Sequence, residues 1–288
     1  MITDAHSHLQ NLLPFTDLEP IFDRMSRSDV MCAVNCSASV DDWAIVEKLA
    51  DPTQFKGALL KIIPAFGIHP WYVTETLRKT PDWEARLENI LRKHPEAFIG
   101  ETGLDAYHEP RNDVLQEEFF KTHLRLGKRL GRPIVIHCVR AWDGMLRILK
   151  EVRQSNELPP ALQFHAFGGG AEIAKQLLRY NAWFSFAGTV LKEKNARGRE
   201  GLLAIPRERI LLETDCPDLV GPAEYRLGLV RQKGDNKCIK SESADLRLVL
   251  KGVAQLLGVE STMLEAQLED NFLRFHACFS PVKSEEAP

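Results

Sequence analysis

The chain has 288 residues, a formal net charge of −3 and a sequence pI near 6.3. Hydrophobic residues make up 44% and charged residues 27%, a balance typical of a globular protein and not of a disordered one. The sequence contains no apolar run of membrane-spanning length and no C-x-x-C pair among the six cysteines. We expect no signal peptide, because the first residues lack a charged segment followed by an apolar one. We therefore expect a cytoplasmic protein with reduced thiols and no overall positive field.

Short apolar strands alternate with amphipathic stretches along the chain. In chain order, the sequence predicts strands at Ile2–Asp4, Val30–Cys36, Ile62–Gly67, Ala97–Gly100, Ile134–Ile136, Ala161–Phe164, Trp183–Phe186 and Ile210–Glu213. Helices are predicted between and after them, at residues 18–27, 41–50, 83–93, 114–130, 144–153, 171–179, 201–205, 244–257 and 263–275. Buried strands that alternate with helices indicate parallel pairing through right-handed crossovers.

Eight such units predict an α/β fold of the closed (β/α)8 barrel type. We expect one barrel over residues 1–280, followed by a disordered tail at 281–288. An open doubly wound sheet is the alternative, but the first strand–helix junction has no G-x-G-x-x-G loop. The barrel is therefore the favoured architecture.

Metal-competent side chains follow several of the predicted strands. His6 and His8 lie two residues apart, so they project to the same face of the first strand. The others come directly after later apolar runs: Glu101 after A-F-I-G, His137 after P-I-V-I, His165 after A-L-Q-F and Asp215 after I-L-L-E-T. In a barrel these strand ends share one rim, where barrel enzymes have their active sites. The sequence therefore predicts a metal site at the carboxyl-terminal rim of the strands.

The size of this ligand set predicts two divalent ions. Six nitrogen and oxygen ligands exceed the needs of one four-coordinate ion that keeps a position open. They suit a pair of ions about 3.5–4 Å apart, with Glu101 as the natural bridge because a carboxylate has two oxygens. Imidazole and carboxylate ligands suit Zn²⁺, Mn²⁺ or Fe²⁺ and do not exclude Mg²⁺. Cys138 and Cys216 neighbour two of the ligands in sequence, so their side chains should point away from the site.

Six segments contain these residues and their neighbours: D-A-H-S-H-L, G-I-H-P-W, G-E-T-G-L-D, V-I-H-C, F-H-A-F-G-G-G and E-T-D-C-P-D-L. In order and spacing they resemble the motifs of the TatD family of metal-dependent deoxyribonucleases, which belongs to the amidohydrolase-type barrel superfamily. The resemblance runs from residue 4 to about residue 219, and weakly to N-F-L-R-F near the end. It implies a two-metal barrel. Its ligands would be His6, His8 and Asp215 for one ion, His137 and His165 for the other, and Glu101 for both.

The chain departs from the family pattern at positions that would face substrate. Family members usually have an arginine two residues after the histidine of the fifth strand, and here Arg140 comes one place later. The usual H-C-F-S-G is replaced by residues 165–169, H-A-F-G-G. The family's N-E-P-like segment is missing, and residues 241–243, S-E-S, are a candidate to stand in its place. Hydrolysis is therefore better supported than the family's DNA substrate.

The residues expected to carry catalysis are Asp215 and Glu101. A two-metal site lowers the pKa of bound water, and Asp215 can ligate metal through one oxygen and accept the water's proton through the other. His69 and Arg140 are the expected substrate contacts, with His69 donating a hydrogen bond to a phosphate. The other histidines are expected to have surface or helix-packing roles: His94, His108, His123 and His276.

Two basic loops follow the seventh and eighth predicted strands. Their cations are Lys192, Lys194, Arg197 and Arg199 in the first loop, and Arg226, Arg231, Lys233, Lys237 and Lys240 in the second. On a barrel rim they would bind phosphates of a single strand with little sequence preference, although solvated loops are an equal alternative. Trp71, Tyr72 and Tyr107 have rings that can stack on bases, but aromatic residues on a barrel rim more often pack loops.

The leading interpretation is a 3′-5′ exonuclease that cleaves single-stranded DNA with two divalent metal ions, Zn²⁺, Mn²⁺ or Mg²⁺. DNA is then the expected partner, with no membrane and no obligate protein partner. One alternative is a small-molecule amidohydrolase, lactonase or phosphotriesterase. Many of those barrels bridge their metals with a carboxylated lysine, where this chain has Glu101. A catalytically silent, metal-stabilised scaffold is the other alternative, and Asp215 argues against it because a scaffold needs no general base.

Overall fold

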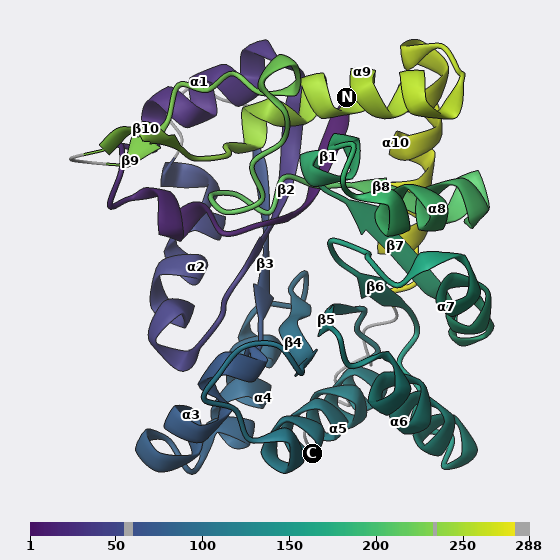
Figure 1. The fold of residues 1–288 in the computed structure, drawn as a ribbon. Coiled ribbons are helices and arrows are strands. Elements are labelled where there is room, and N and C mark those ends of the chain that lie inside the picture. Colours follow the sequence, from purple (N-terminus) through teal and green to yellow (C-terminus); the bar gives the residue numbers. More distant parts are fainter. Residues whose placement is uncertain (55–59, 233–234, 280–288) are drawn as a thin grey trace.

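The computed structural model describes residues 1–54, 60–232 and 235–279 (Figure 1). Eight parallel strands form one sheet in sequence order: β1 (Ile2–Ser7), β2 (Val30–Cys36), β3 (Lys61–Phe66), β4 (Phe98–Asp105), β5 (Ile134–Val139), β6 (Leu162–Phe164), β7 (Ala182–Phe186) and β8 (Ile210–Leu212). The ends of the first and last strands meet, because the amide of Asp215 donates to the carbonyl of His6 and the amide of His8 to that of Cys216, both at 3.0 Å. The predicted barrel is confirmed.

Ten α-helices connect and cover the strands within the described residues. They are α1 (Glu19–Arg27), α2 (Trp43–Ala50), α3 (Val73–Lys79), α4 (Trp83–Lys93), α5 (Asp113–Leu130), α6 (Trp142–Gln154), α7 (Gly170–Leu177), α8 (Ala196–Ala204), α9 (Leu246–Leu257) and α10 (Ser261–Ala277). Their apolar faces follow the helical repeat, as in α6, where Met145, Ile148, Leu149 and Val152 are all buried. In this part of the chain, no helix has both the length and the apolar character needed to cross a bilayer.

Several predicted boundaries were wrong. β4 continues to Asp105, whereas the prediction ended at Gly100, because the polar letters E-T-G-L-D read as a loop although they pair with β5. Helix α3 was missed because its valine and threonines have low helix propensity. The short pair β9 (Arg231–Gln232) and β10 (Asp235–Ile239), in the second basic loop, was also missed. The tail predicted at 281–288 lies outside the described residues.

The interior of the barrel is apolar below the site, and the rim at the carboxyl-terminal ends of the strands is polar. Residues that alternate along the strands form one buried cluster inside the barrel: Ala5, Val34, Ile63, Ala65, Phe98, Val135, Ala161, Trp183 and Leu211. Helix α10 adds Phe272 and Phe275 to this cluster, and the Phe275 ring lies 5.4 Å from that of Phe98. This closely packed cluster therefore supports the strands and holds the side chains at their carboxyl ends in place.

Gly103 allows β4 and β5 to approach each other beside the site. It pairs with His137 and has a φ of 148°, in the region that favours glycine. A Cβ atom there would lie 1.9 Å from the carbonyl oxygen of His137. The glycine thus brings the carboxyl end of β4 against the strand that carries His137.

Histidine 123 supports the loop that follows β3. It is fully buried on α5 and stacks on Trp83, with 5.1 Å between the ring centroids. Its Nε2 accepts the amide N–H of Ile68 at 3.1 Å, and its Nδ1 donates to the carbonyl of Phe119 at 2.7 Å. Only the neutral ring satisfies both contacts. Burial lowers the pKa of His123 to about 4.

Because His123 is buried in its neutral form, we predict that the folded protein loses stability in mild acid. The pKa of an unfolded histidine is about 6.5, so the unfolded chain binds a proton first, and stability should fall as the pH drops from about 6.5 to about 4. The contribution is at most about 3 kcal/mol. We expect the free energy of unfolding of His123→Gln to depend less on pH in this range, because glutamine keeps a hydrogen-bond acceptor but does not titrate. Urea unfolding of both proteins in chelator at pH 7.5, 6.5, 5.5 and 4.5 measures the difference, and parallel profiles would contradict it.

Candidate metal centre

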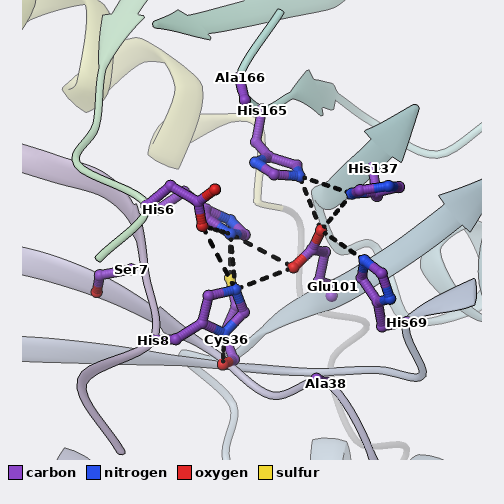
Figure 2. A network of polar contacts seen from close by, with 12 residues as sticks. His6, Ser7, His8, Cys36, Ala38, His69, Glu101, His137, His165 and Ala166 are labelled. Atoms are coloured by element: carbon purple, nitrogen blue, oxygen red, sulfur yellow. Dashed lines mark hydrogen bonds and ion pairs between the residues drawn. The ribbon is translucent and has the colours of Figure 1, made fainter. Parts of the chain in front are cut away.

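His6 and His8 form one cluster with an oxygen of Glu101 at the carboxyl-terminal rim (Figure 2). Asp215 lies in contact with both histidines of this cluster. The Nε2 atoms of His6 and His8 lie 3.1 Å apart. Glu101 Oε2 lies 3.4 Å from the first and 3.1 Å from the second, and Asp215 Oδ1 lies 3.3 and 3.6 Å from them. Two imidazole nitrogens and two carboxylate oxygens thus converge on one point, in a buried environment. This donor set suits a divalent cation.

The second oxygen of Glu101 faces a second group of histidines, which adjoins the first because the His165 ring stacks on that of His6 with 4.0 Å between centroids. Glu101 Oε1 lies 2.7 Å from His165 Nε2 and 3.0 Å from His137 Nδ1, and these two nitrogens are 3.2 Å apart. Figure 2 shows the Glu101 carboxylate between the two groups. All six residues predicted as ligands therefore lie together, and Glu101 has one oxygen in each cluster.

His69 also points at Glu101, and its hydrogen bonds favour a donor over a metal ligand. Its Nε2 lies 3.4 Å from Glu101 Oε1, while its Nδ1 accepts the amide N–H of Trp71 at 3.2 Å. A neutral imidazole that accepts at Nδ1 carries its proton on Nε2. Burial lowers the pKa of His69 to about 4, which keeps the ring neutral. His69 thus presents an N–H group to the site, as its predicted role of hydrogen-bond donor requires.

In three of the four histidines, the far ring nitrogen has a partner outside the clusters. His6 Nδ1 lies 3.3 Å from the Cys36 sulfur, and His8 Nδ1 lies 2.8 Å from the Cys36 carbonyl oxygen. His137 Nε2 lies 3.2 Å from Asp105 Oδ2. Such contacts fix the tautomer and orientation of metal-binding imidazoles.

The far nitrogen of His165 is the exception. His165 Nδ1 is buried, makes no hydrogen bond and lies 3.6 Å from Oε1 of the buried Glu213. Glu213 itself accepts from the Ala166 amide at 2.6 Å and from the Ser185 hydroxyl. The Glu213 carboxylate thus faces the far nitrogen while Nε2 lies in the cluster, an arrangement that fits a metal-binding imidazole with a carboxylate behind it.

Asp105 is a member of the site that sequence analysis missed. It occupies the last position of β4, four residues after Glu101, so both side chains point to the same side of the strand. Its contact with His137 holds the pKa of Asp105 well below its usual range, despite the burial that opposes this. The spacing in G-E-T-G-L-D was a usable signal, but the predicted end of the strand at Gly100 concealed it.

Another buried carboxylate, Asp4, holds the segment that carries Asp215. Its Oδ1 accepts the Thr214 amide at 2.8 Å and its Oδ2 accepts the Thr214 hydroxyl at 2.6 Å. Asp215 follows directly with a φ of 49°, in the left-handed region that non-glycine residues seldom adopt. Asp4 therefore ties β1 to the residues after β8 and helps to aim the Asp215 side chain.

The charges in the two clusters stabilise ionised carboxylates. Burial alone would raise the pKa of Glu101, but His165, His6 and the hydrogen bond from His137 hold that pKa well below its usual range. The pKa of Asp215 is likewise lowered to about 2 by His6 and neighbouring imidazoles, against the effect of burial. Burial and His6 lower the pKa of His165, but Glu101 raises it by more than these two lower it. The resulting pKa is about 9, above the usual value of a histidine. A cation that binds these imidazoles must therefore displace protons.

The remaining predicted substrate contacts lie outside the clusters. Arg140 follows β5 and is exposed, and its guanidinium carbon lies 4.2 Å from the centroid of the Tyr107 ring. In the basic loops, Arg199 donates to the carbonyls of Val190 and Leu191, and Arg226 to that of Gly221, so both fasten their own loops. Three other cations of these loops are exposed: Lys192, Lys194 and Arg197. Lys240 lies near Asp218. Lys233 and the side chain of Lys237 lie outside the described part of the chain.

The cysteines carry free thiols, and the candidate clusters within the described residues contain none of them. Cys36 is nevertheless in contact with His6, which the sequence did not suggest.

The S-E-S segment has a structural role: Glu242 binds Arg24 on α1, with 2.6 Å between Oε2 and Nη2. Trp142 packs against Phe167, with 5.3 Å between the ring centroids.

Known proteins are similar to this chain in sequence and in fold. A family model described as TatD related DNase matches residues 3–277. The metal-dependent hydrolase YabD of Bacillus subtilis is 28% identical over 247 residues, which cover 86% of this chain and 91% of YabD. The 3′-5′ ssDNA/RNA exonuclease TatD of Klebsiella pneumoniae is 31% identical over 206 residues, 71% of this chain and 73% of that protein.

The crystal structure of the TatD homologue YjjV of Escherichia coli K12 superposes with a TM-score of 0.78. That structure is 22% identical in sequence, and the match covers 95% of this chain and 97% of YjjV. The likeness extends over the whole barrel, as does the family match. The chain is therefore a metal-dependent hydrolase of the TatD family.

Proposed function

We propose that this hydrolase is a divalent-metal-dependent deoxyribonuclease that shortens single-stranded DNA from its 3′ end. One observation carries the proposal: the two oxygens of the buried Glu101 face two adjoining clusters of ligand-type side chains. Two-metal sites of this kind are common in phosphatases and nucleases. The name of the Klebsiella relative supports the polarity and the single-stranded substrate.

The proposed ligands are His6, His8, Asp215 and Glu101 for one ion, and His137, His165 and Glu101 for the other. Divalent ions bound there would lower the pKa of a water molecule and neutralise the oxygens of a phosphodiester. Asp215 directs Oδ1 toward His6 and His8, which leaves its other oxygen to accept the proton of the attacking water. With a pKa of about 2, Asp215 is ionised at neutral pH, as a proton acceptor must be.

His69 would bind and orient the substrate. Its Nε2–H group points toward Glu101, and the ring stays neutral, so it can donate a hydrogen bond to a phosphate oxygen. We also propose that the exposed cation of Arg140 contacts the phosphate backbone. The expected bond cleavage leaves a shortened strand and one mononucleotide in each cycle.

Metal removal and reloading test the proposed function. We expect the metal-free protein to leave end-labelled oligonucleotides intact, and reloading with Mg²⁺, Mn²⁺ or Zn²⁺ to restore stepwise shortening of a 5′-labelled single strand. The label position reports polarity, because removal from the 3′ end yields a ladder and removal from the 5′ end yields a labelled mononucleotide. His6→Ala serves as the inactive control.

The outcome also separates the competing functions. Turnover of a small ester, lactone or amide panel without any shortening of DNA would contradict the nuclease and favour a small-molecule hydrolase. A reloaded protein that turns over none of these compounds would favour a metal-stabilised scaffold. Equal activity before and after metal removal would contradict the role proposed for both clusters.

A further inference from the structure

Two large aromatic side chains remain exposed beside the candidate metal centre. Trp71, in the turn after β3, is 47% exposed, and Tyr107, just after β4, is 63% exposed. The Trp71 ring centroid lies 4.7 Å from that of His69 and 6.4 Å from that of His137. The indole thus borders the clusters directly, and we call Trp71, Tyr107, His108 and Arg140 the aromatic wall.

The buried carboxylate of Asp105 organises this wall. Its Oδ1 accepts the backbone amides of Tyr107 at 2.7 Å and His108 at 3.0 Å. Its Oδ2 accepts the indole N–H of Trp71 at 2.7 Å and lies 3.2 Å from His137 Nε2. One side chain therefore fixes the position of the wall relative to a candidate metal ligand.

Stacking contacts hold the rings of the wall in fixed orientations. The Trp71 ring stacks on that of His108, with 4.2 Å between centroids and 24° between planes. The guanidinium of Arg140 covers part of the Tyr107 ring at 4.2 Å. Since Tyr107 keeps most of its surface exposed under this contact, a flat group can still reach its ring. A stacking surface that is already ordered loses little conformational entropy when it binds.

Arg140 adds an available positive charge to the wall. Among the described residues, no carboxylate lies within 4.0 Å of its guanidinium, whereas Arg147 on the next helix pairs with both Glu117 and Glu151. A guanidinium stacked on an aromatic ring and without an acidic partner can bind phosphate through its edge. The wall therefore offers an aromatic face and a phosphate-binding group side by side.

Other aromatic residues on the rim behave differently. Tyr72, next to Trp71 in sequence, is half-buried and packs against the hydrophobic core. Trp142 also packs against the core and lies against Phe167. Loop packing accounts for these two rings, but it does not account for Trp71 and Tyr107, which expose large surfaces toward solvent at the edge of the site.

We infer that Trp71 and Tyr107, with Arg140, form a subsite that stacks the nucleobase next to the scissile phosphodiester of a nucleic-acid strand. This inference rests on the proposed function and names the part of the substrate that the rim recognises. Stacking on aromatic rings accepts every base, so the subsite predicts recognition of a strand end with little base preference. It also predicts that an end without a base is a poor substrate.

The test compares two single strands that differ only in the terminal nucleotides, which carry bases in one and are abasic in the other. The metal-loaded wild type should have a lower KM for the strand with bases. We expect Tyr107→Ala to reduce this preference on the order of tenfold, the usual effect of removing a stacking ring. Tyr107→Phe retains the ring and should retain the preference.

Tyr180, whose ring is partly buried against the core, provides a control far from the site. It lies in the 3-10 helix Leu178–Tyr180 before β7, and Arg153 stands over its ring at 5.7 Å, so it forms a similar pair at the other end of the strands. Tyr180→Ala should keep the wild-type preference. A Tyr107→Ala protein that cleaves DNA with an undiminished preference overturns the inference alone. A wild type that cleaves neither strand overturns the proposed function, and the inference with it.

Discussion

Asp215→Asn should lower kcat on a single-stranded oligonucleotide by about 10²- to 10⁴-fold, the usual contribution of a general base. Asparagine keeps an oxygen at the position of Oδ1, which lies 3.3 Å from His6 Nε2, so the shape of the first cluster is retained. It loses the negative charge, and with it the ability to accept a proton from water. Because Asp215 is also a proposed metal ligand, the comparison is made at saturating metal, where we expect a folded protein that turns over very slowly.

Single-turnover kinetics together with metal analysis of the purified variant measure this effect. Asp218→Asn is the matched control, because Asp218 is an exposed carboxylate three residues further along the same segment. We expect its activity to stay within about twofold of wild type, as for most surface substitutions. An Asp215→Asn protein with full activity would exclude Asp215 as the base.

Glu101→Gln should weaken metal binding at both clusters. Oε1 lies 2.7 Å from His165 Nε2 and Oε2 lies 3.1 Å from His8 Nε2, so one substitution removes a charged oxygen from each. Loss of an outer partner of a metal ligand typically lowers metal affinity about 10- to 100-fold, so loss of a shared direct ligand should lower it by more than about 100-fold. We expect activity to fall with the metal content.

Metal titration by calorimetry and the number of ions per chain after dialysis measure this second effect. Glu84→Gln on α4 changes an exposed glutamate of the same type and should retain wild-type stoichiometry. Two ions bound with unchanged affinity to Glu101→Gln would rule out the shared ligand. Loss of one ion alone would restrict the role of Glu101 to a single cluster.

Most of the candidate site could be predicted because local rules determine it. Residues i and i+2 of a strand share a face, so His6 and His8 had to project together. Apolar runs followed by Glu101, His137 and His165 put ligand-type residues near the carboxyl ends of strands, and a parallel barrel gathers those ends on one rim. The structure brings them together, although Glu101 and His137 lie inside β4 and β5 and not after them.

The contacts around the ligands could not be predicted, because they depend on which strands are neighbours and in what register. Asp105 meets His137 because the two strands pair with Gly103 opposite His137, a register that no local pattern encodes. Cys36 meets His6 because β2 lies beside β1. In the same way, the tautomer of His69 follows from a backbone amide two residues away in a turn.

By itself, the sequence determined the barrel, the rim on which the site lies and the six ligand-type residues, because the strand repeat and the order of the elements are local properties of the chain. Only the tertiary structure decided which oxygen of Glu101 faces which histidines, and that Asp105 joins His137 to the exposed rings of Trp71 and Tyr107. These contacts join residues from different strands and loops, and their geometry is set by packing across the sheet.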